Sequence, residues 1–326
     1  MGLGAASSWI IDNDFGMTCF DRAQFTGFCK TYSANNKVTD SAASGTALGT
    51  GNKTNNSMVG VLPDGTPVAN MTELAKAKGL STGIVVSSYV QDATPGGFMA
   101  HQKARGMRKE ISQDIIDLRP DVVVGGGKKY FVEGKSKDGS RSLLDVAKET
   151  FNYVETPEEF LGTDEIPVLG LFSDASYPDA IERGTDYLVD AMTHAIDLLD
   201  DNKNGFFLMT EGSLIDHAEH ANNAEQLAFE MEEFDKAVNA AFDYADTHKG
   251  TLVIVTADHE TGGTAVVSTN KDFNKGEAST EVKFVTTGHT AALVPLYAYG
   301  ANAWQFSGVM ENTDVFKRMK ALLIGE

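Results

Sequence analysis

Short apolar runs alternate along the chain with stretches in which apolar residues recur at helical spacing. The apolar runs predict strands at Thr82–Ser87, Asp121–Val124, Gly205–Met209, Thr251–Thr256 and Leu293–Tyr299. The periodic stretches predict helices at Met71–Lys78, Met107–Leu118, Asp186–Leu199 and Ala224–Thr247. This alternation is typical of an α/β fold with a doubly wound, mostly parallel central sheet and helices on both faces.

The run Leu252-Val253-Ile254-Val255 is apolar at every position, as expected of a strand covered on both faces. We find no internal repeat, low-complexity tract or linker, so residues 1–326 are predicted to form a single domain. The polar segments 130–165 and 268–285 are rich in Lys, Asp, Glu and Gly, and we expect both to be surface excursions.

Polar residues directly follow several of the predicted strands. In doubly wound folds, ligands bind beyond the carboxyl ends of the strands. Thr210-Glu211-Gly212 and the loop Asp258–Gly263 each continue a strand, and Gln91–Pro95 comes shortly after another. These segments are therefore predicted to line a functional site.

The composition limits the classes of molecule that the protein is expected to bind. The net charge of −19 and pI of about 4.7 disfavour nucleic acid and anionic membranes as partners, and an anion site would need local cations. No apolar run approaches the length of a membrane span. The only cysteines, Cys19 and Cys29, could pair, but they are too few for a four-cysteine zinc site.

The segment Val38–Thr46 places Ser41 after an acidic residue and before a run of small residues. If a helix starts here, its amino end presents free N–H groups and a partial positive charge, which suit phosphate. Ser41 can therefore be a nucleophile on an anion-binding turn. It can equally be an ordinary capping serine, since Asp and Ser are favoured N-caps.

Two further clusters offer metal ligands. Asp216 and His220 are four residues apart, which places them on one helical face, and Glu211 lies shortly before them. Asp258 and His259 directly follow an apolar strand. Carboxylate and imidazole groups suit zinc, although Asp and His also occur commonly on solvated helix faces.

Four other residues become candidates in view of these clusters. His289 precedes an apolar strand, and taken singly it is expected to be a structural histidine rather than a ligand. Arg105 offers the fork of donors that binds phosphate bidentately, which an acidic protein needs at an anion site. His101 and His217 have either a supporting or a structural role.

In this order, the segments resemble those of the alkaline phosphatase family. The matching segments are Val38–Thr46, Gln91–Pro95 with His101 and Arg105, Gly205–Asn222, Thr251–His259 and Thr287–Gly300. Less diagnostic similarity continues through Val122–Phe131 and Leu169–Asp200, so the resemblance extends over essentially the whole chain. Several motifs in the correct order are far more specific than any one of them.

The resemblance implies hydrolysis of small phosphate monoesters through a phosphoserine intermediate. Ser41 looks like the nucleophile, and Arg105, oriented by Asp40, looks like the clamp on the substrate phosphate. His217 occupies a position near the phosphate that differs between family members. A homodimer in the periplasm or outside the cell is also implied.

The resemblance further implies two Zn²⁺ ions and one Mg²⁺ ion. The implied ligands are Asp216, His220 and His289 for the first zinc, Asp258, His259 and Ser41 for the second, and Thr94 and Glu211 for magnesium. Asp92 looks like a supporting residue near the magnesium. When bound, such ions lower the pKa of a serine hydroxyl and of water, and they neutralise charge on the leaving oxygen.

The family pattern differs from this sequence at three places. An apolar strand ending in Asp-Gly precedes a segment like Met1–Gly4 in the family, and its aspartate bridges the second zinc and the magnesium. We expect the chain to be an N-terminally incomplete piece with both sites compromised; the alternative is a protein that lacks this strand. Thr261 replaces a histidine found in some members, and this replacement predicts a looser or differently tuned first zinc. The segment between His259 and His289 is short, so we expect any subdomain that covers the dimer crown in larger relatives to be small here.

Two other functions compete with the monoesterase. A sulfatase or phosphodiesterase belongs to the same superfamily, but sulfatases use a Cys/Ser-x-Pro-x-Arg context that Ser41 lacks, and diesterases generally use threonine. A catalytically impaired metal-binding fragment is the other alternative, and the missing aspartate is its only support.

Overall fold

The computed structural model describes residues 1–270 and 280–325, and its described strands form two larger sheets and two small ones. The larger is a five-stranded sheet in the order β4-β5-β3-β2-β6, in which every pair is parallel. Its strands are β2 (Ser81–Tyr89), β3 (Val122–Gly126), β4 (Asn152–Val154), β5 (Val168–Leu171) and β6 (Phe206–Glu211).

The second sheet has four strands in the order β13-β1-β12-β7. They are β1 (Phe25–Lys30), β7 (Leu252–Thr256), β12 (Val294–Gly300) and β13 (Gly308–Glu311). β12 is antiparallel to both β1 and β7, whereas β13 is parallel to β1. The predicted doubly wound architecture is confirmed, but the strands form two separate sheets. β6 is an edge strand of the parallel sheet, and β7 is an edge strand of the mixed sheet.

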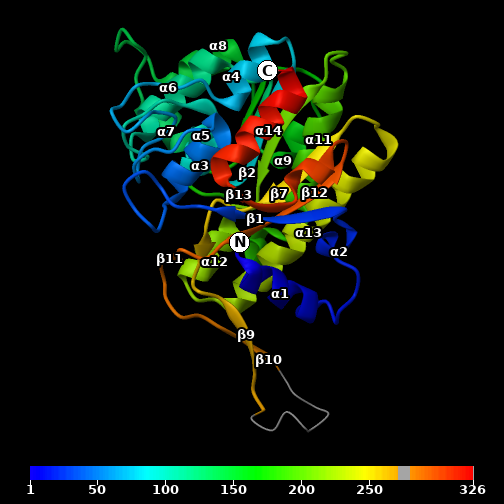
Figure 1. The fold of residues 1–326 in the computed structure, drawn as a ribbon. Coiled ribbons are helices and arrows are strands. Elements are labelled where there is room, and N and C mark those ends of the chain that lie inside the picture. The colour runs from blue at the N-terminus through cyan, green and yellow to red at the C-terminus, as the bar shows by residue number, and fades with distance from the viewer. Residues whose placement is uncertain (271–279, 326) are drawn as a thin grey trace.

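Helices cover both faces of the parallel sheet (Figure 1), because its side chains alternate between two apolar layers. Val85 packs in one layer with α11 (Tyr187–Asp200) and α13 (Ala224–Thr247). Its neighbours Ile84 and Val86 pack in the other layer. The helices of that layer include α3 (Ser41–Thr50), α4 (Met71–Ala77), α5 (Ala93–Met99), α6 (Arg108–Leu118) and α14 (Asn312–Ile324).

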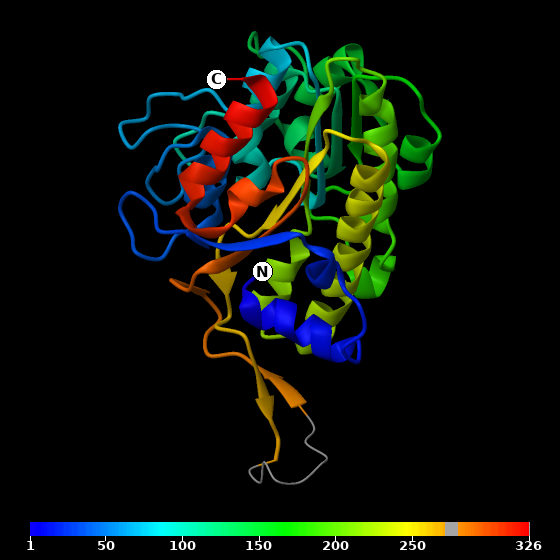
Figure 2. The same ribbon diagram turned by 45° about the vertical axis from the view of Figure 1, so that its right-hand side comes forward.

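The remaining elements are short or lie at the periphery. The helices are α1 (Leu3–Asp12), α2 (Cys19–Arg22), α7 (Lys128–Glu133), α8 (Leu143–Thr150), α9 (Pro157–Leu161), α10 (Ala180–Arg183), α12 (Leu214–His220) and the 3₁₀ helix η1 (Ala303–Phe306). The strands are β8 (Glu260–Thr261), β9 (Ala265–Ser268), β10 (Thr280–Lys283) and β11 (His289–Thr290). Both ribbon views show the β9–β10 hairpin extending away from the body (Figures 1 and 2).

The predicted strands and helices all occur, with ends within two residues of those expected. The prediction for 130–165 needs correction. This segment contributes β4 to the parallel sheet and buries Phe131, Phe151 and Phe160, so much of it belongs to the core. Of the other expected excursion, residues 280–283 form a largely exposed strand, and 271–279 lie outside the described residues.

The two cysteines are not joined by a disulfide bond. Cys19 and Cys29 are both free thiols, and both are buried. Among the described residues, no helix has the length and apolar character needed to cross a bilayer.

Candidate active site

Ser41 is the first residue of α3, and the residue before it caps the helix. The Asp40 carboxylate accepts a hydrogen bond from the Ala43 N–H at 3.0 Å, and its other oxygen accepts one from the Ser57 N–H at 2.8 Å. Because Asp40 supplies the N-cap, the hydroxyl of Ser41 is not needed for that purpose. The Ser41 Oγ instead lies 3.0 Å from Nε2 of His259.

Glycines bring α3 and α5 into backbone contact, and this contact places Ser41 near the segment that carries Thr94. A Cβ on Gly97 would lie 2.5 Å from the carbonyl carbon of Gly45, and a Cβ on Gly45 would lie 2.9 Å from Cα of Thr94. Only glycine permits so close an approach of two helices. The small-residue run that follows Ser41 therefore serves helix packing.

Three predicted ligands, Asp216, His259 and His289, converge beside Ser41. One ligand atom of each lies within 4.8 Å of the others. His220 joins them, because its Nε2 lies 3.3 Å from an Asp216 oxygen and 3.1 Å from Nε2 of His289. The residues come from α12, from the loop after β7 and from β11, so the fold assembles what the sequence separates.

The hydrogen bonds of these imidazoles suit metal ligation. Nδ1 of His289 donates to the Thr39 carbonyl at 2.9 Å, and Nδ1 of His220 donates to the Thr287 carbonyl at 2.6 Å. When both rings are neutral with the proton on Nδ1, each presents the lone pair of Nε2 to the other; when His220 is protonated, its Nε2 instead carries an N–H, which lies 3.3 Å from Asp216. Such carbonyl-oriented histidines are typical of metal sites, and two facing lone pairs require a proton or a cation between them.

Thr261 links two of the ligands. Its hydroxyl donates to Asp216 at 2.5 Å and lies 3.1 Å from Nδ1 of His259, from which it can accept. In the sequence Thr261 stands out only as a departure from the family pattern, and its adjacency to Asp258-His259 is the one signal for this role. The residue therefore orients both a carboxylate and an imidazole of the cluster.

The charges of the cluster are strongly coupled. Burial alone would raise the pKa of Asp216, but the hydrogen bond from His220 and the charge of His259 hold it well below its usual range. The same hydrogen bond raises the pKa of His220 to about 9. Burial and the neighbouring His259 lower the pKa of His289. The cluster thus has one firmly ionised carboxylate for several imidazoles.

Asp258 and His259 form a second group with Ser41. The Asp258 Oδ2 lies 3.1 Å from Nε2 of His259, the same nitrogen that the Ser41 hydroxyl approaches. Although burial opposes it, the charge of His259 lowers the pKa of Asp258 to about 2. Ser44, which the sequence did not single out, fixes the loop by donating its hydroxyl to the Asp258 carbonyl at 2.6 Å.

The third group consists of carboxylates and a hydroxyl. Thr94 Oγ1 lies 3.5 Å from Oδ2 of Asp258. Burial, followed by the negative charge of Asp92, raises the pKa of Glu211 to about 8. The Ser213 hydroxyl, which no sequence pattern singled out, donates to Glu211 at 2.6 Å. Crowded oxygen ligands of this kind suit Mg²⁺, which would relieve their mutual repulsion.

Arg105 connects the helix of Ser41 to this group. Its guanidinium donates to Asp92 at 3.1 Å and lies 3.8 Å from Asp40. The side chain remains 34% exposed, so donors are left for a ligand. A cation held between two carboxylates beside Ser41 supplies the local positive charge that an anion site needs in this acidic protein.

Two histidines lie apart from these groups. His101 is held by Glu73 at 2.9 Å and by the Gly60 carbonyl at 2.8 Å, so it has a structural role. His217 is exposed on α12 and, among the described residues, makes none of the hydrogen bonds of the cluster. The structure thus brings Ser41, Arg105, Asp40 and Asp92 together with the predicted ligands, and leaves His217 at the edge.

A serine hydroxyl, a guanidinium and convergent imidazole and carboxylate ligands lie at the carboxyl edge of a doubly wound sheet, and they define an α/β metallohydrolase. A sequence model described as alkaline phosphatase matches residues 11–274 and 262–324. The chain belongs to the alkaline phosphatase family.

Individual relatives and solved structures that resemble this chain are also alkaline phosphatases. Alkaline phosphatase 4 of Bacillus subtilis is 34% identical over 94% of this chain and 82% of its own length. The alkaline phosphatase structure from the Antarctic bacterium TAB5 superposes with a TM-score of 0.91 at 33% identity, over 99% of this chain and 95% of that one. A histidine-to-aspartate variant of that enzyme, described with Mg bound in its M3 site, gives a TM-score of 0.89 at 34% identity over 99% and 94%. The chain is accordingly a metal-dependent phosphomonoester hydrolase.

Proposed function

We propose that Ser41 attacks the phosphorus of a small phosphate monoester and becomes transiently phosphorylated. The observation that carries the proposal is the 3.0 Å separation of Ser41 Oγ from Nε2 of His259, at the amino end of a helix already capped by Asp40. The free N–H groups at that end of α3 favour an anion, and the Arg105 fork can hold two equatorial phosphate oxygens.

We propose two Zn²⁺ ions and one Mg²⁺ ion as cofactors. Asp216, His220 and His289 would hold the first zinc, Asp258, His259 and Ser41 the second, and Thr94 and Glu211 the magnesium, with Asp92 nearby. Nitrogen ligands with their Nδ1 atoms fixed on carbonyls support zinc, and the oxygen-only group supports magnesium. When bound, these ions supply a lowered pKa for the serine hydroxyl and for water, and neutralise charge on the leaving oxygen.

The chain's own residues perform the remaining tasks. Asp40 fixes the start of α3 by accepting a hydrogen bond from the Ala43 N–H. It also accepts one from the Ser57 N–H, which fixes that loop beside Arg105. Asp92 anchors the guanidinium, so that its free N–H groups point in one direction. A homodimer and a periplasmic or extracellular location remain part of the proposal, on the family resemblance alone.

The test is the fate of the phosphate on Ser41. Protein loaded with zinc and magnesium is expected to hydrolyse p-nitrophenyl phosphate much faster than the matching diester or sulfate. Ser41→Ala should lower that rate by about 1,000-fold or more and abolish trapping of labelled phosphate after an acid quench. Ser136→Ala, in a partly exposed loop, serves as the matched control. Equal rates for Ser41→Ala and the unmodified protein would overturn the proposal.

A further inference from the structure

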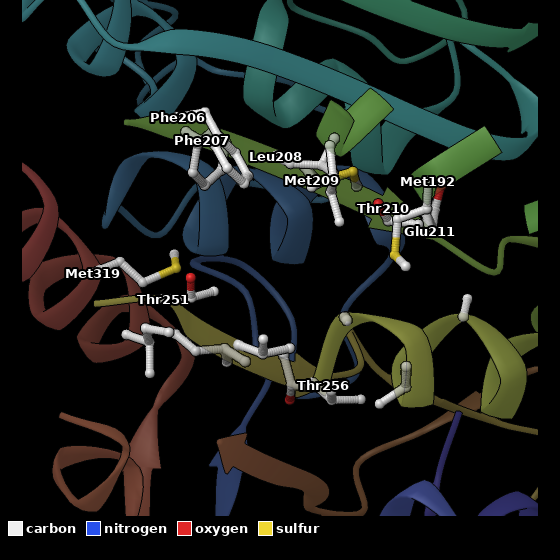
Figure 3. Close-up of a pocket in the computed structure, with 18 of the residues that line it drawn as sticks. Met192, Phe206, Phe207, Leu208, Met209, Thr210, Glu211, Thr251, Thr256 and Met319 are labelled. Atoms are coloured by element: carbon white, nitrogen blue, oxygen red, sulfur yellow. The ribbon is translucent and has the colours of Figure 1, made fainter. Parts of the chain in front are cut away.

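Tyr89 and Arg108 lie beside Asp92 but belong to none of the groups described above. Figure 3 shows Glu211 at the end of β6, and the parallel pairing of β2 with β6 extends to this residue. Tyr89 is the last residue of β2, so it lies at the same carboxyl edge of the parallel sheet. Arg108 is the first residue of α6, shortly after Arg105. The elements that supply the candidate active site therefore also bring these two side chains to its rim.

The hydroxyl of Tyr89 connects Arg108 to Asp92. Nη2 of Arg108 donates to the hydroxyl oxygen at 3.0 Å. Asp92 faces the same hydroxyl: burial, followed by the charge of Asp92 and a hydrogen bond to it, raises the pKa of Tyr89. A guanidinium can only donate, so the Tyr89 oxygen accepts from Arg108 and its own proton is left for the carboxylate. The hydrogen bonds therefore run in one direction, from Arg108 through Tyr89 to Asp92.

Asp92 is the acceptor that Tyr89 and Arg105 share. Its Oδ1 accepts from the Ala93 N–H at 2.7 Å and from Nη2 of Arg105 at 3.1 Å. Its Oδ2 has only a long contact, at 3.4 Å, with the hydroxyl of Ser88. A carboxylate that is held firmly at one oxygen can still turn about that oxygen, and a further strong donor removes this freedom. The Tyr89 hydroxyl is placed to be that donor.

Two aromatic rings hold Arg108 in place. Its guanidinium carbon lies 5.0 Å from the centroid of the Tyr89 ring and 5.2 Å from that of Tyr130, and the two rings are 5.8 Å apart. These distances are typical of cation–π contacts. Within the described residues Arg108 forms no ion pair, and its buried Nε has no hydrogen-bond partner. In this acidic protein, the guanidinium is thus fixed by the rings and the hydroxyl rather than by a carboxylate.

The end of β2 is irregular where it carries Tyr89. The pairing of β2 with β3 shifts register between Val85 and Tyr89. In a regular strand, neighbouring side chains point to opposite faces of the sheet, yet the hydroxyls of Ser88 and Tyr89 both face Asp92. Irregularities of this kind are common beside active sites, where they redirect a side chain. The distorted end of β2 therefore accounts for the position of the Tyr89 hydroxyl.

We propose that Tyr89 is a positioning residue for phosphate binding. Its hydroxyl, held by Arg108, orients Asp92, and Asp92 in turn directs the guanidinium of Arg105 toward the substrate phosphate. The inference rests on the phosphate-binding role proposed for Arg105, and neither Tyr89 nor Arg108 needs to touch the substrate. Without the hydroxyl, the fork of Arg105 takes a wider range of directions, so phosphate binding weakens although no phosphate contact is removed.

The test is a double-mutant cycle, with the Kd of inorganic phosphate measured by calorimetry on protein of equal zinc and magnesium content. Tyr89→Phe keeps the ring and removes only the hydroxyl, so the Kd should rise by about 5-fold. Arg105→Ala should raise it by about 10-fold or more, and adding Tyr89→Phe to Arg105→Ala should change nothing further. Tyr299→Phe is the matched control, because its hydroxyl donates to Asp246 at the end of β12 remote from the site. It should leave the Kd unchanged.

A second arm tests the support from Arg108. Arg108→Met keeps an apolar stem against the rings but loses the donor, so the Kd should rise, and Arg108→Lys should restore most of the affinity. An unchanged Kd in Tyr89→Phe would overturn the inference, and so would an effect of Tyr89→Phe or Arg108→Met that persists in full without Arg105, since that would indicate direct contact with phosphate. An unchanged Kd in Arg105→Ala would overturn the phosphate clamp of the proposed function, and this inference with it. The other two outcomes leave the proposed function intact.

Discussion

The Nε2 atoms of His220 and His289 lie 3.1 Å apart, while Nδ1 of each ring donates to a backbone carbonyl. Two imidazole lone pairs cannot face each other at this distance without a proton or a metal cation between them. The carboxylate of Asp216, 3.3 Å from His220, adds a negative charge that also favours a cation at this point. The proposed zinc ion, bound by nitrogen ligands, would meet this requirement.

His289→Ala is expected to weaken zinc binding at the first site. It removes a ligand nitrogen, so the loss should exceed the roughly 10–100-fold that follows loss of a supporting hydrogen bond. Competition with a chromogenic chelator measures the affinity, and far-UV circular dichroism checks the fold. His248→Ala, at an exposed histidine on the carboxyl end of α13, should leave zinc affinity unchanged. Unchanged affinity in His289→Ala would exclude the proposed ligand set.

Thr261→Val tests the link between Asp216 and His259. Valine keeps the shape of the side chain but can neither donate to the carboxylate nor accept from Nδ1 of His259. We expect zinc affinity to fall by about 10-fold or more, and Thr261→Ser to restore most of it. Thr264→Val is the control, because its hydroxyl donates to Glu219 outside the cluster. A similar affinity in Thr261→Val and Thr264→Val would assign Thr261 a packing role only.

Much of the fold was predictable because its signals are local. The apolar strands and the periodic helices such as 224–247 are set by nearby side chains, and the polar residues at strand ends mark the site. Ser41 at the first turn of a helix was also predictable. Its alternative role as a cap was not decided by sequence, because Asp40 and Ser41 are both good caps and only the hydrogen bonds distinguish them.

The prediction that failed and the features that the sequence did not reveal all depend on tertiary contacts. Segment 130–165 is polar on average, but a few aromatic residues such as Phe160 bury it against the sheet, and an average conceals them. Thr261 gains its role only when α12 meets the loop after β7. Division of the sheet into two blocks depends on which strands become neighbours, and periodicity does not encode neighbours.

Gly97→Ala tests the contact that positions Ser41 against Thr94. The new methyl group would lie 2.5 Å from the Gly45 backbone and 2.7 Å from the Thr46 nitrogen, so the helices must separate. We expect a loss of about 1–3 kcal/mol in the free energy of unfolding, from urea denaturation, together with reduced phosphatase activity. Gly106→Ala is the matched control, because nothing lies within 4 Å of its Cβ position. Equal stability of the two variants would show that α3 and α5 can adjust without strain.

Arg105→Lys is expected to weaken phosphate recognition while keeping the charge. Lysine cannot contact Asp92 and two phosphate oxygens with one rigid fork. We expect KM for p-nitrophenyl phosphate and the inhibition constant of inorganic phosphate to rise together by about 10-fold, because each lost charged hydrogen bond weakens binding on that scale. Arg141→Lys, at an exposed pair with Glu149, controls for the substitution. A change in kcat alone would contradict a role in binding.

The pH dependence of stability can be tested at His101 and Glu73, away from the metal ligands. The imidazole faces two acceptors, Glu73 at 2.9 Å and the Gly60 carbonyl at 2.8 Å, and only the protonated ring can donate to both. The hydrogen bond to Glu73 raises the pKa of His101 above its ordinary 6.5. Burial opposes ionisation of Glu73, but the hydrogen bond from His101 lowers its pKa below 4.5.

These shifts define the pH window. The contribution of His101 is complete below pH 6.5 and is lost as the pH rises through its raised pKa; that of Glu73 is present above pH 4.5 and is lost on acidification. His101→Gln should therefore lower the free energy of unfolding most near pH 6, by about 1 kcal/mol for a partly exposed pair, and clearly less at pH 9. Urea denaturation at both pH values, with equal metal content, measures the difference. His194→Gln, whose ring is hydrogen-bonded to the Thr163 carbonyl and packs against Phe160, should show no such trend. If the effect of His101→Gln grew from pH 6 to pH 9, the protonated ring would not be the stabilising form.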